Sequence, residues 1–147
     1  MVKSIVGVIV GYIVMVILQV ATFMTVYTIV GANWAFKPRA FQASTRWTLI
    51  QFCVIFVTAV IAGLVCALIS KSRKAPLALA AVVLLIGFIA ASGKVATQGP
   101  DPHDVRVAPP SNMEAMQKAR NHTWVLFLGP VIGAVGAVLG GKLRRQS

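Results

Sequence analysis

The sequence lacks ionisable side chains over four long stretches. Of its 147 residues only 12% are charged, and only three of those are acidic. Lys, Arg, His, Asp and Glu are absent from the ranges 4–31, 47–69, 76–92 and 123–141. A helix of about 20 apolar residues crosses a bilayer core of about 30 Å. We therefore predict an all-α membrane protein, a single domain whose four transmembrane helices occupy these ranges.

The absence of charge within the predicted spans excludes several classes of function. Ion and proton pathways place ionisable groups inside a span, and these are missing here. Both histidines, His103 and His122, lie outside the spans, so a haem or a similar pigment would lack its usual axial ligand in the membrane. We expect no cofactor and no enzymatic activity.

Cysteine is also scarce, and its placement argues against a disulfide or a metal cluster. Cys53 and Cys66 lie thirteen residues apart on one predicted helix, or about 19 Å along its axis. That separation is too long for a bridge, which needs Cα atoms within about 7 Å. Outside the spans, Asp101, His103 and Asp104 are near neighbours on one loop, which does not define a coordination geometry. We expect no metal site.

Basic residues number fourteen against three acidic ones, but they are spread over five short segments that flank the spans. A nucleic-acid footprint concentrates Lys and Arg on one soluble face, so we expect no nucleic acid partner. The segments 71–74 and 142–145 hold basic residues directly beside helix ends, where they weigh most on orientation. We expect both termini in the cytoplasm and the chain in a bacterial inner membrane. The run at 4–31 is about twice as long as a signal-peptide core, so we expect it to be retained.

Small residues are the main positive feature of the spans. In lipid, helices associate through Gly and Ala, which let two backbones approach closely. The fourth stretch carries two such rows at a spacing of four, and the first two stretches repeat the pattern more weakly. The predicted packing residues are Gly129, Gly133, Gly136, Ala137, Gly140, Gly141, Ala59, Gly63, Gly7 and Gly11. Their partner is either another helix of this chain or a helix of a different subunit.

Three uncharged polar residues are singled out within the spans: Gln19, Gln51 and Thr58. An amide in hydrocarbon favours a hydrogen-bonding partner on a neighbouring helix. We expect Gln19 to face the second span or another subunit, with Thr58 as its leading partner within the chain. A polar substrate path is the alternative interpretation.

Aromatic side chains near the span ends predict an interfacial belt, because Trp and neighbouring aromatics settle at the headgroup level. The predicted anchors are Trp34, Phe36, Phe41, Trp47 and Trp124. Docking against a neighbouring protein or a specific lipid is the alternative. In the long third loop, 93–122, Ser111 and Glu114 form a capping-box pattern that predicts a short amphipathic helix over 112–120.

These features favour a non-catalytic accessory or structural subunit that packs against other helices in a larger membrane complex, by analogy a respiratory or photosynthetic one. Its expected partners are membrane lipids and other membrane protein subunits, in a hetero-complex rather than a homo-oligomer. Two alternatives remain. The first is a small oligomeric transporter or channel with a path lined by Gln and Thr, and the second is a lipid-modifying membrane enzyme that uses the loop histidine and acids.

Overall fold

A computed structural model describes residues 2–35, 43–72, 74–97 and 121–144, which are helical with no strand among them. The helices are α1 (Val2–Val30), α2 (Ala32–Ala35), α3 (Thr45–Ser70), α4 (Ala75–Thr97) and α6 (Thr123–Leu143). All except α2 are long and apolar enough to cross a membrane. The prediction of an all-α protein with four membrane-spanning helices is confirmed. The amphipathic helix predicted over 112–120 lies outside the described residues.

The four long helices extend slightly beyond most of the charge-free stretches. The largest difference is in α4, which continues past Lys94 to Thr97, whereas the predicted span ended at residue 92. A lysine is excluded from the middle of a bilayer but not from a helix, so the absence of charge marks the membrane core and not the helix end. Pro76 lies in the first turn of α4, where its missing N–H leaves no hydrogen bond unmade.

Local backbone chemistry sets the ends of α1 and α3. Gly31, with φ of 79°, follows α1 and donates its N–H to the Tyr27 carbonyl at 2.9 Å. Ser44 caps α3 by accepting from the Trp47 N–H at 3.1 Å, and its own hydroxyl donates to the Trp34 carbonyl at 2.8 Å. The short helix α2 is therefore tied to the start of α3. At its other end α3 stops at Lys71, a left-handed residue with φ of 51°.

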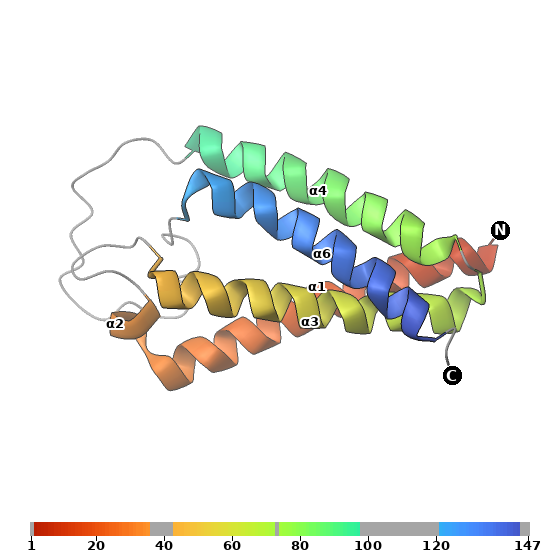
Figure 1. The fold of residues 1–147 in the computed structure, drawn as a ribbon, viewed down its shortest axis with the longest axis horizontal. Coiled ribbons are helices and arrows are strands. Elements are labelled where there is room, and N and C mark those ends of the chain that lie inside the picture. The colour runs from red at the N-terminus through yellow and green to blue at the C-terminus, as the bar shows by residue number, and fades with distance from the viewer. Residues whose placement is uncertain (1, 36–42, 73, 98–120, 145–147) are drawn as a thin grey trace.

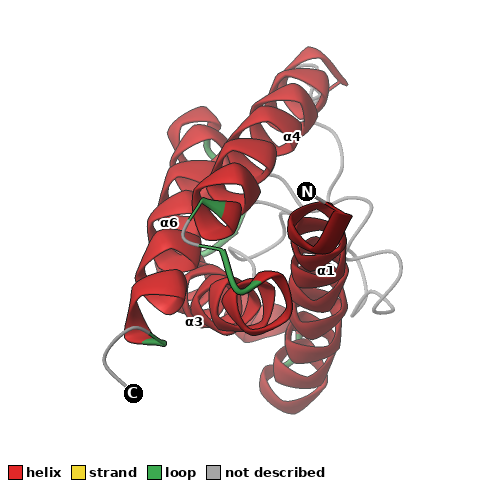
Figure 2. Cartoon of the chain, turned by 90° about the vertical axis from the view of Figure 1, so that its right-hand side faces the viewer, coloured by secondary structure: helices red, strands yellow, loops and turns green. Residues whose placement is uncertain are grey.

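Helix α6 lies between α3 and α4 (Figure 1), and it packs extensively against both, whereas α3 and α4 touch each other little. Helix α1 packs mainly on α3, and Figure 2 shows it on the far side of α3 from α6. The start of α1, the turn between α3 and α4, and the end of α6 lie at one end of the bundle. We call this the basic end, because it carries Lys3, Lys71, Lys74, Lys142 and Arg144.

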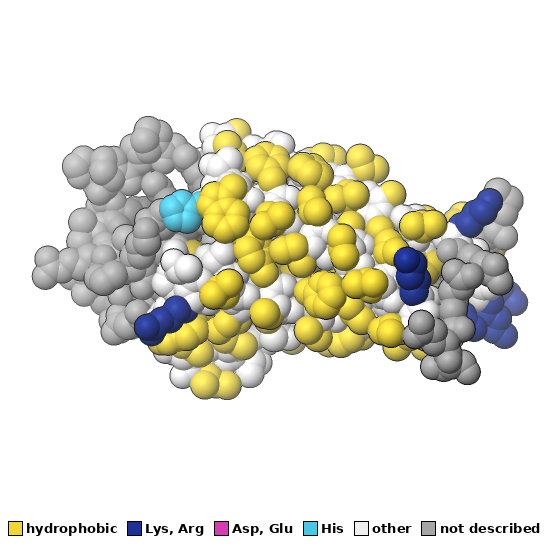
Figure 3. Space-filling model, viewed as in Figure 1, with side chains coloured by type: hydrophobic (Ala, Val, Ile, Leu, Met, Phe, Trp, Pro, Cys, Tyr) yellow, Lys and Arg dark blue, Asp and Glu magenta, His cyan; other side chains and the backbone are white. Residues whose placement is uncertain are grey.

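The core is built from small side chains, and the large ones point outward. Leu79 and Cys66 are the largest fully buried side chains among the described residues, and Ala59, Ala62 and Ala137 are completely buried. Exposed aliphatic residues cover the middle of the bundle, and on the face in Figure 3 Lys and Arg lie only towards its ends. This distribution suits helices that contact one another closely through small residues and contact lipid through large ones.

Candidate functional site

The glycine face of α6 is buried against α3 within the same chain. A Cβ added at Gly63 would lie within 3.0 Å of the Ala137 backbone, and one at Gly140 would meet the Val60 carbonyl group equally closely. Gly136 faces Ala59, with a built Cβ 2.9 Å from the Ala59 Cβ. The α3 and α6 backbones therefore touch directly, so the partner left open by the sequence is a helix of this chain.

An adjoining side of α6 contacts α4 through two proline–glycine pairs. The Pro76 ring lies against Gly141, and the Pro130 ring lies against Gly87. The sequence did not single out Gly87, because the only other glycine of α4 is Gly93, which does not continue a spacing of four. The role of Gly87 as a contact residue can be recognised only once the structure shows that Pro130 lies opposite it.

Helix α1 uses its predicted glycines to approach α3. A Cβ on Gly7 would lie 3.0 Å from the Cys66 carbonyl oxygen, and one on Gly11 would lie 3.1 Å from that of Ala62. Gly133 of α6 faces Val83 of α4 at 3.2 Å by the same measure. The predicted small-residue positions thus form the interior contacts of a single four-helix unit.

A partly open pocket of about 230 Å³ lies between the four long helices. We call it the glutamine groove, because Gln19 of α1 and Gln51 of α3 both line it. Among the described residues that line it, Tyr12 is the only other one with a polar side chain. Aliphatic and small residues make up the remainder, including Val83, Gly87 and Pro130. The groove is therefore an apolar recess with two amides.

The side-chain carbonyl of Gln51 is the one buried side-chain nitrogen or oxygen atom without a hydrogen-bond partner in the part of the chain that the structure describes. Gln19, on the same groove, is half-buried. No hydrogen bond joins Gln19 to Thr58 among the described residues. The Thr58 hydroxyl donates instead to the carbonyls of Val54 at 2.7 Å and Ile55 at 3.1 Å. Gln51, and not Thr58, is thus the polar residue of α3 that shares a recess with Gln19.

The threonines expected to line a substrate path bond within their own helices. Thr25 donates to the Ala21 carbonyl at 2.8 Å, and Thr28 donates to Met24 at the same distance. Thr48 donates to the carbonyl of its helix cap, Ser44, at 3.1 Å. Such bonds satisfy a hydroxyl without any neighbour. The polar groups on the groove are therefore two amides and one phenol, and not a continuous row.

The predicted aromatic anchors within the described ranges lie at the end opposite the basic end. Trp47 contacts the rings of Phe23 and Tyr27, with centroids 6.1 and 6.2 Å away, and so closes α1 onto α3. Trp124 is 57% exposed, and its ring lies 6.0 Å from that of Phe52. Trp34 lies in α2. Phe36 and Phe41 lie outside the described residues.

Within the described ranges, no three His, Cys, Asp or Glu side chains come together as a metal site would require. The loop residues Asp101, His103 and Asp104 lie outside those ranges.

No protein-family model, curated protein or solved structure matches this chain.

Proposed function

We propose that the protein is a non-catalytic accessory subunit of a larger membrane assembly, and that the glutamine groove receives a side chain from a helix of a different membrane protein. The observation that carries this proposal is the buried Gln51 carbonyl, which has no hydrogen-bond partner among the described residues. It belongs to a partly open groove that all four long helices line. In this proposal the partner of this oxygen is a donor that arrives from a different membrane protein.

The energetics of a polar atom in lipid support this interpretation. A buried acceptor without a donor destabilises a protein by about 1–3 kcal/mol. Interhelical hydrogen bonds in membranes contribute about 0.6 kcal/mol on average and reach 1–2 kcal/mol. A hydrogen-bond donor from a neighbouring helix therefore recovers much of the free energy that the isolated chain loses by burying the unpaired Gln51 carbonyl. The groove thus favours the associated state.

The surface of the bundle favours a hetero-complex over a homo-oligomer. The exposed side chains along the middle of the helices are predominantly aliphatic. Thr25 is exposed on α1, but its hydroxyl donates to its own helix, as does that of Ser92 on α4. Apart from the exposed indole N–H of Trp124, a second copy of this chain would therefore offer few donors near the depth of Gln51. In this proposal the basic end faces the cytoplasm, because basic residues beside helix ends stay on that side.

Site-specific photo-crosslinking tests the proposal directly. A photoreactive residue replaces Ile86, which lines the groove from α4 and is 42% exposed. The matched control position is Val135 of α6, which is 51% exposed and does not line the groove. We expect residue 86 to crosslink to one membrane protein in stoichiometric yield in native membranes, and residue 135 to crosslink mainly to lipid.

A second arm links the crosslink to the amide. Gln51→Leu, which cannot accept a hydrogen bond, should weaken recovery of the complex in mild detergent about threefold to tenfold, the range of a bond worth roughly 0.6–1.4 kcal/mol. Thr25→Val, a polar-to-apolar change outside the groove, should leave recovery unchanged. Crosslinks from residue 86 only to further copies of this chain, together with solute transport in liposomes, would overturn the proposal in favour of an oligomeric transporter.

A further inference from the structure

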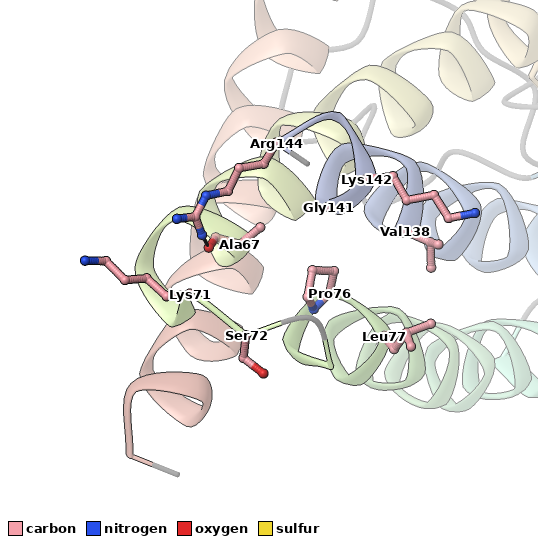
Figure 4. A pocket seen from close by; sticks show the side chains of 9 residues that line it. All are labelled: Ala67, Lys71, Ser72, Pro76, Leu77, Val138, Gly141, Lys142 and Arg144. Carbon is pink, nitrogen blue, oxygen red and sulfur yellow. Dashed lines mark hydrogen bonds between the residues drawn. The ribbon is translucent and has the colours of Figure 1, made fainter. Parts of the chain in front are cut away.

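A second pocket, of about 250 Å³, lies at the basic end, where α3 ends, α4 begins and α6 ends (Figure 4). Its rim is polar and cationic, formed by Lys71, Ser72, Lys142 and Arg144. Its wall is apolar and includes Pro76, Leu77 and Val138. We call it the basic pocket. It is separate from the glutamine groove, and the two share no lining residue.

One cation of the rim is held in place by the backbone. Arg144 donates a guanidinium hydrogen bond to the carbonyl oxygen of Ala67, in the last turn of α3. The Lys71 N–H donates to the same oxygen at 3.2 Å. Among the described residues, the Ala67 carbonyl is the only hydrogen-bond acceptor of the Arg144 guanidinium. Lys71 and Lys142 are exposed, and in Figure 4 their side chains point away from Arg144 on opposite sides, so each must turn towards an anion that binds beside Arg144.

The charge of the rim has no internal counterion in the part of the chain that the structure describes. All three acidic residues, Asp101, Asp104 and Glu114, lie in the range 98–120, outside the described residues. Helix α4 begins at the pocket, whereas α3 and α6 end there, so the helix dipoles do not add net positive charge and the charge of the rim comes from its Lys and Arg side chains. The rim is therefore complementary to an anion.

The apolar wall of the pocket indicates which kind of anion the pocket fits. Leu77 is 58% exposed, and Val138, on the facing side of α6, is half-buried. Both lie where a membrane-spanning helix leaves its charged end and enters the apolar part of the bundle. A free inorganic anion gains nothing from this wall, whereas a molecule with a charged head and a hydrocarbon tail contacts rim and wall together.

We propose that the basic pocket binds an anionic phospholipid, with its phosphate against Arg144, Lys71 and Lys142 and the start of an acyl chain against Leu77 and Val138. Guanidinium groups recognise phosphate oxygens through paired hydrogen bonds, and lysines add point charges. The binding is independent of any protein partner in the glutamine groove.

The test measures lipid binding to the purified, delipidated full chain in neutral detergent. Native mass spectrometry counts bound lipid as phosphatidylglycerol, phosphatidylcholine or inorganic phosphate is added. We expect saturable binding of one phosphatidylglycerol, at least tenfold tighter than phosphatidylcholine, with no saturable binding of inorganic phosphate. The double variant Lys71→Gln/Lys142→Gln should weaken phosphatidylglycerol binding about thirtyfold. Each basic residue near an anionic lipid raises the affinity about fivefold, and the two factors multiply.

The matched control is Lys3→Gln. Lys3 is an exposed lysine at the same end of the bundle, but it does not line the pocket, so its substitution should change affinity less than twofold. Equal weakening by Lys3→Gln would show diffuse charge attraction and would overturn the site. Equal affinity for the two lipids, or saturable binding of inorganic phosphate, would also overturn it. The two substituted lysines are exposed, and an unchanged circular dichroism spectrum confirms that the variant is folded.

Discussion

Pro76 of α4 lies with its ring against Gly141 of α6. Eleven residues further along α4, and eleven residues back along α6, the two residue types are exchanged, and Pro130 of α6 lies against Gly87 of α4. Eleven residues correspond to about three helical turns, so both pairs fall on the same face of each helix. A proline ring has no rotamers through which it can withdraw, and a glycine opposite it leaves the needed space. The two pairs thus fix the antiparallel register of α4 and α6.

This register predicts opposite effects for the same substitution at two glycines of α4. In Gly87→Ala the new methyl would lie 2.6 Å from the Pro130 Cβ, so we expect a loss of stability of about 1–3 kcal/mol from overpacking. In Gly93→Ala the methyl meets no atom within 4 Å, so the change should be neutral or stabilising by up to about 1 kcal/mol. Thermal unfolding of the purified chain in detergent measures both. Equal shifts for the two variants would show that the Pro130 contact does not set the register.

The α3–α6 contact predicts a second contrast, at Gly63. Gly63→Ala would press a methyl into the Ala137 backbone, and we expect it to destabilise the bundle by about 3 kcal/mol or more, because backbone atoms cannot rotate away. Gly129→Ala makes only an ordinary contact, 3.5 Å from the Ile55 Cδ1, and should cost less than about 1 kcal/mol. Resistance to unfolding by sodium dodecyl sulfate ranks the variants. A chain that tolerates alanine at residue 63 would contradict direct backbone contact between α3 and α6.

For the isolated chain, Gln51→Leu should raise stability by about 1 kcal/mol, because it removes a buried acceptor that has no donor among the described residues. Gln19→Leu is the comparison: Gln19 is half-buried and leaves no such buried atom, so the gain should be smaller. Thermal unfolding of the purified monomer measures the difference. A marked loss of stability in Gln51→Leu would mean that the amide is already satisfied, for example by water in the groove.

The cap of α3 provides a fourth prediction. Ser44→Ala removes both the bond from the Trp47 N–H and the bond to the Trp34 carbonyl, and we expect a loss of about 1–2 kcal/mol. Ser92→Ala removes one exposed hydroxyl bond within α4, to Phe88, and should change stability by less than about 0.5 kcal/mol. Hydrogen exchange of the Trp47 amide should accelerate only in Ser44→Ala. Unchanged protection there would show that the serine is not the cap.

The sequence identifies the four spans well because lipid imposes one simple rule, the exclusion of charge, on every residue of a span. It also places the close contacts, since small residues at a spacing of four are needed wherever backbones touch. What it does not provide is the rotation and register of one helix against another. For that reason the sequence does not identify Gly87 as a contact residue. It also pairs Gln19 with Thr58, whereas the structure places Gln51 in the same groove as Gln19.

The position of α6 between α3 and α4 has a consequence for how the chain matures in the membrane. Synthesis delivers α3 and α4 as neighbours joined by a short turn, yet much of the surface on which they pack is supplied by α6, which is made after both. Before α6 is inserted, Gly63 and Gly87 lack the α6 residues against which they pack, and the Ala67 carbonyl lacks its hydrogen bond from Arg144. The packing of α3 and α4 is therefore completed only after α6 has been inserted, because α6 supplies contacts that these two helices do not make with each other.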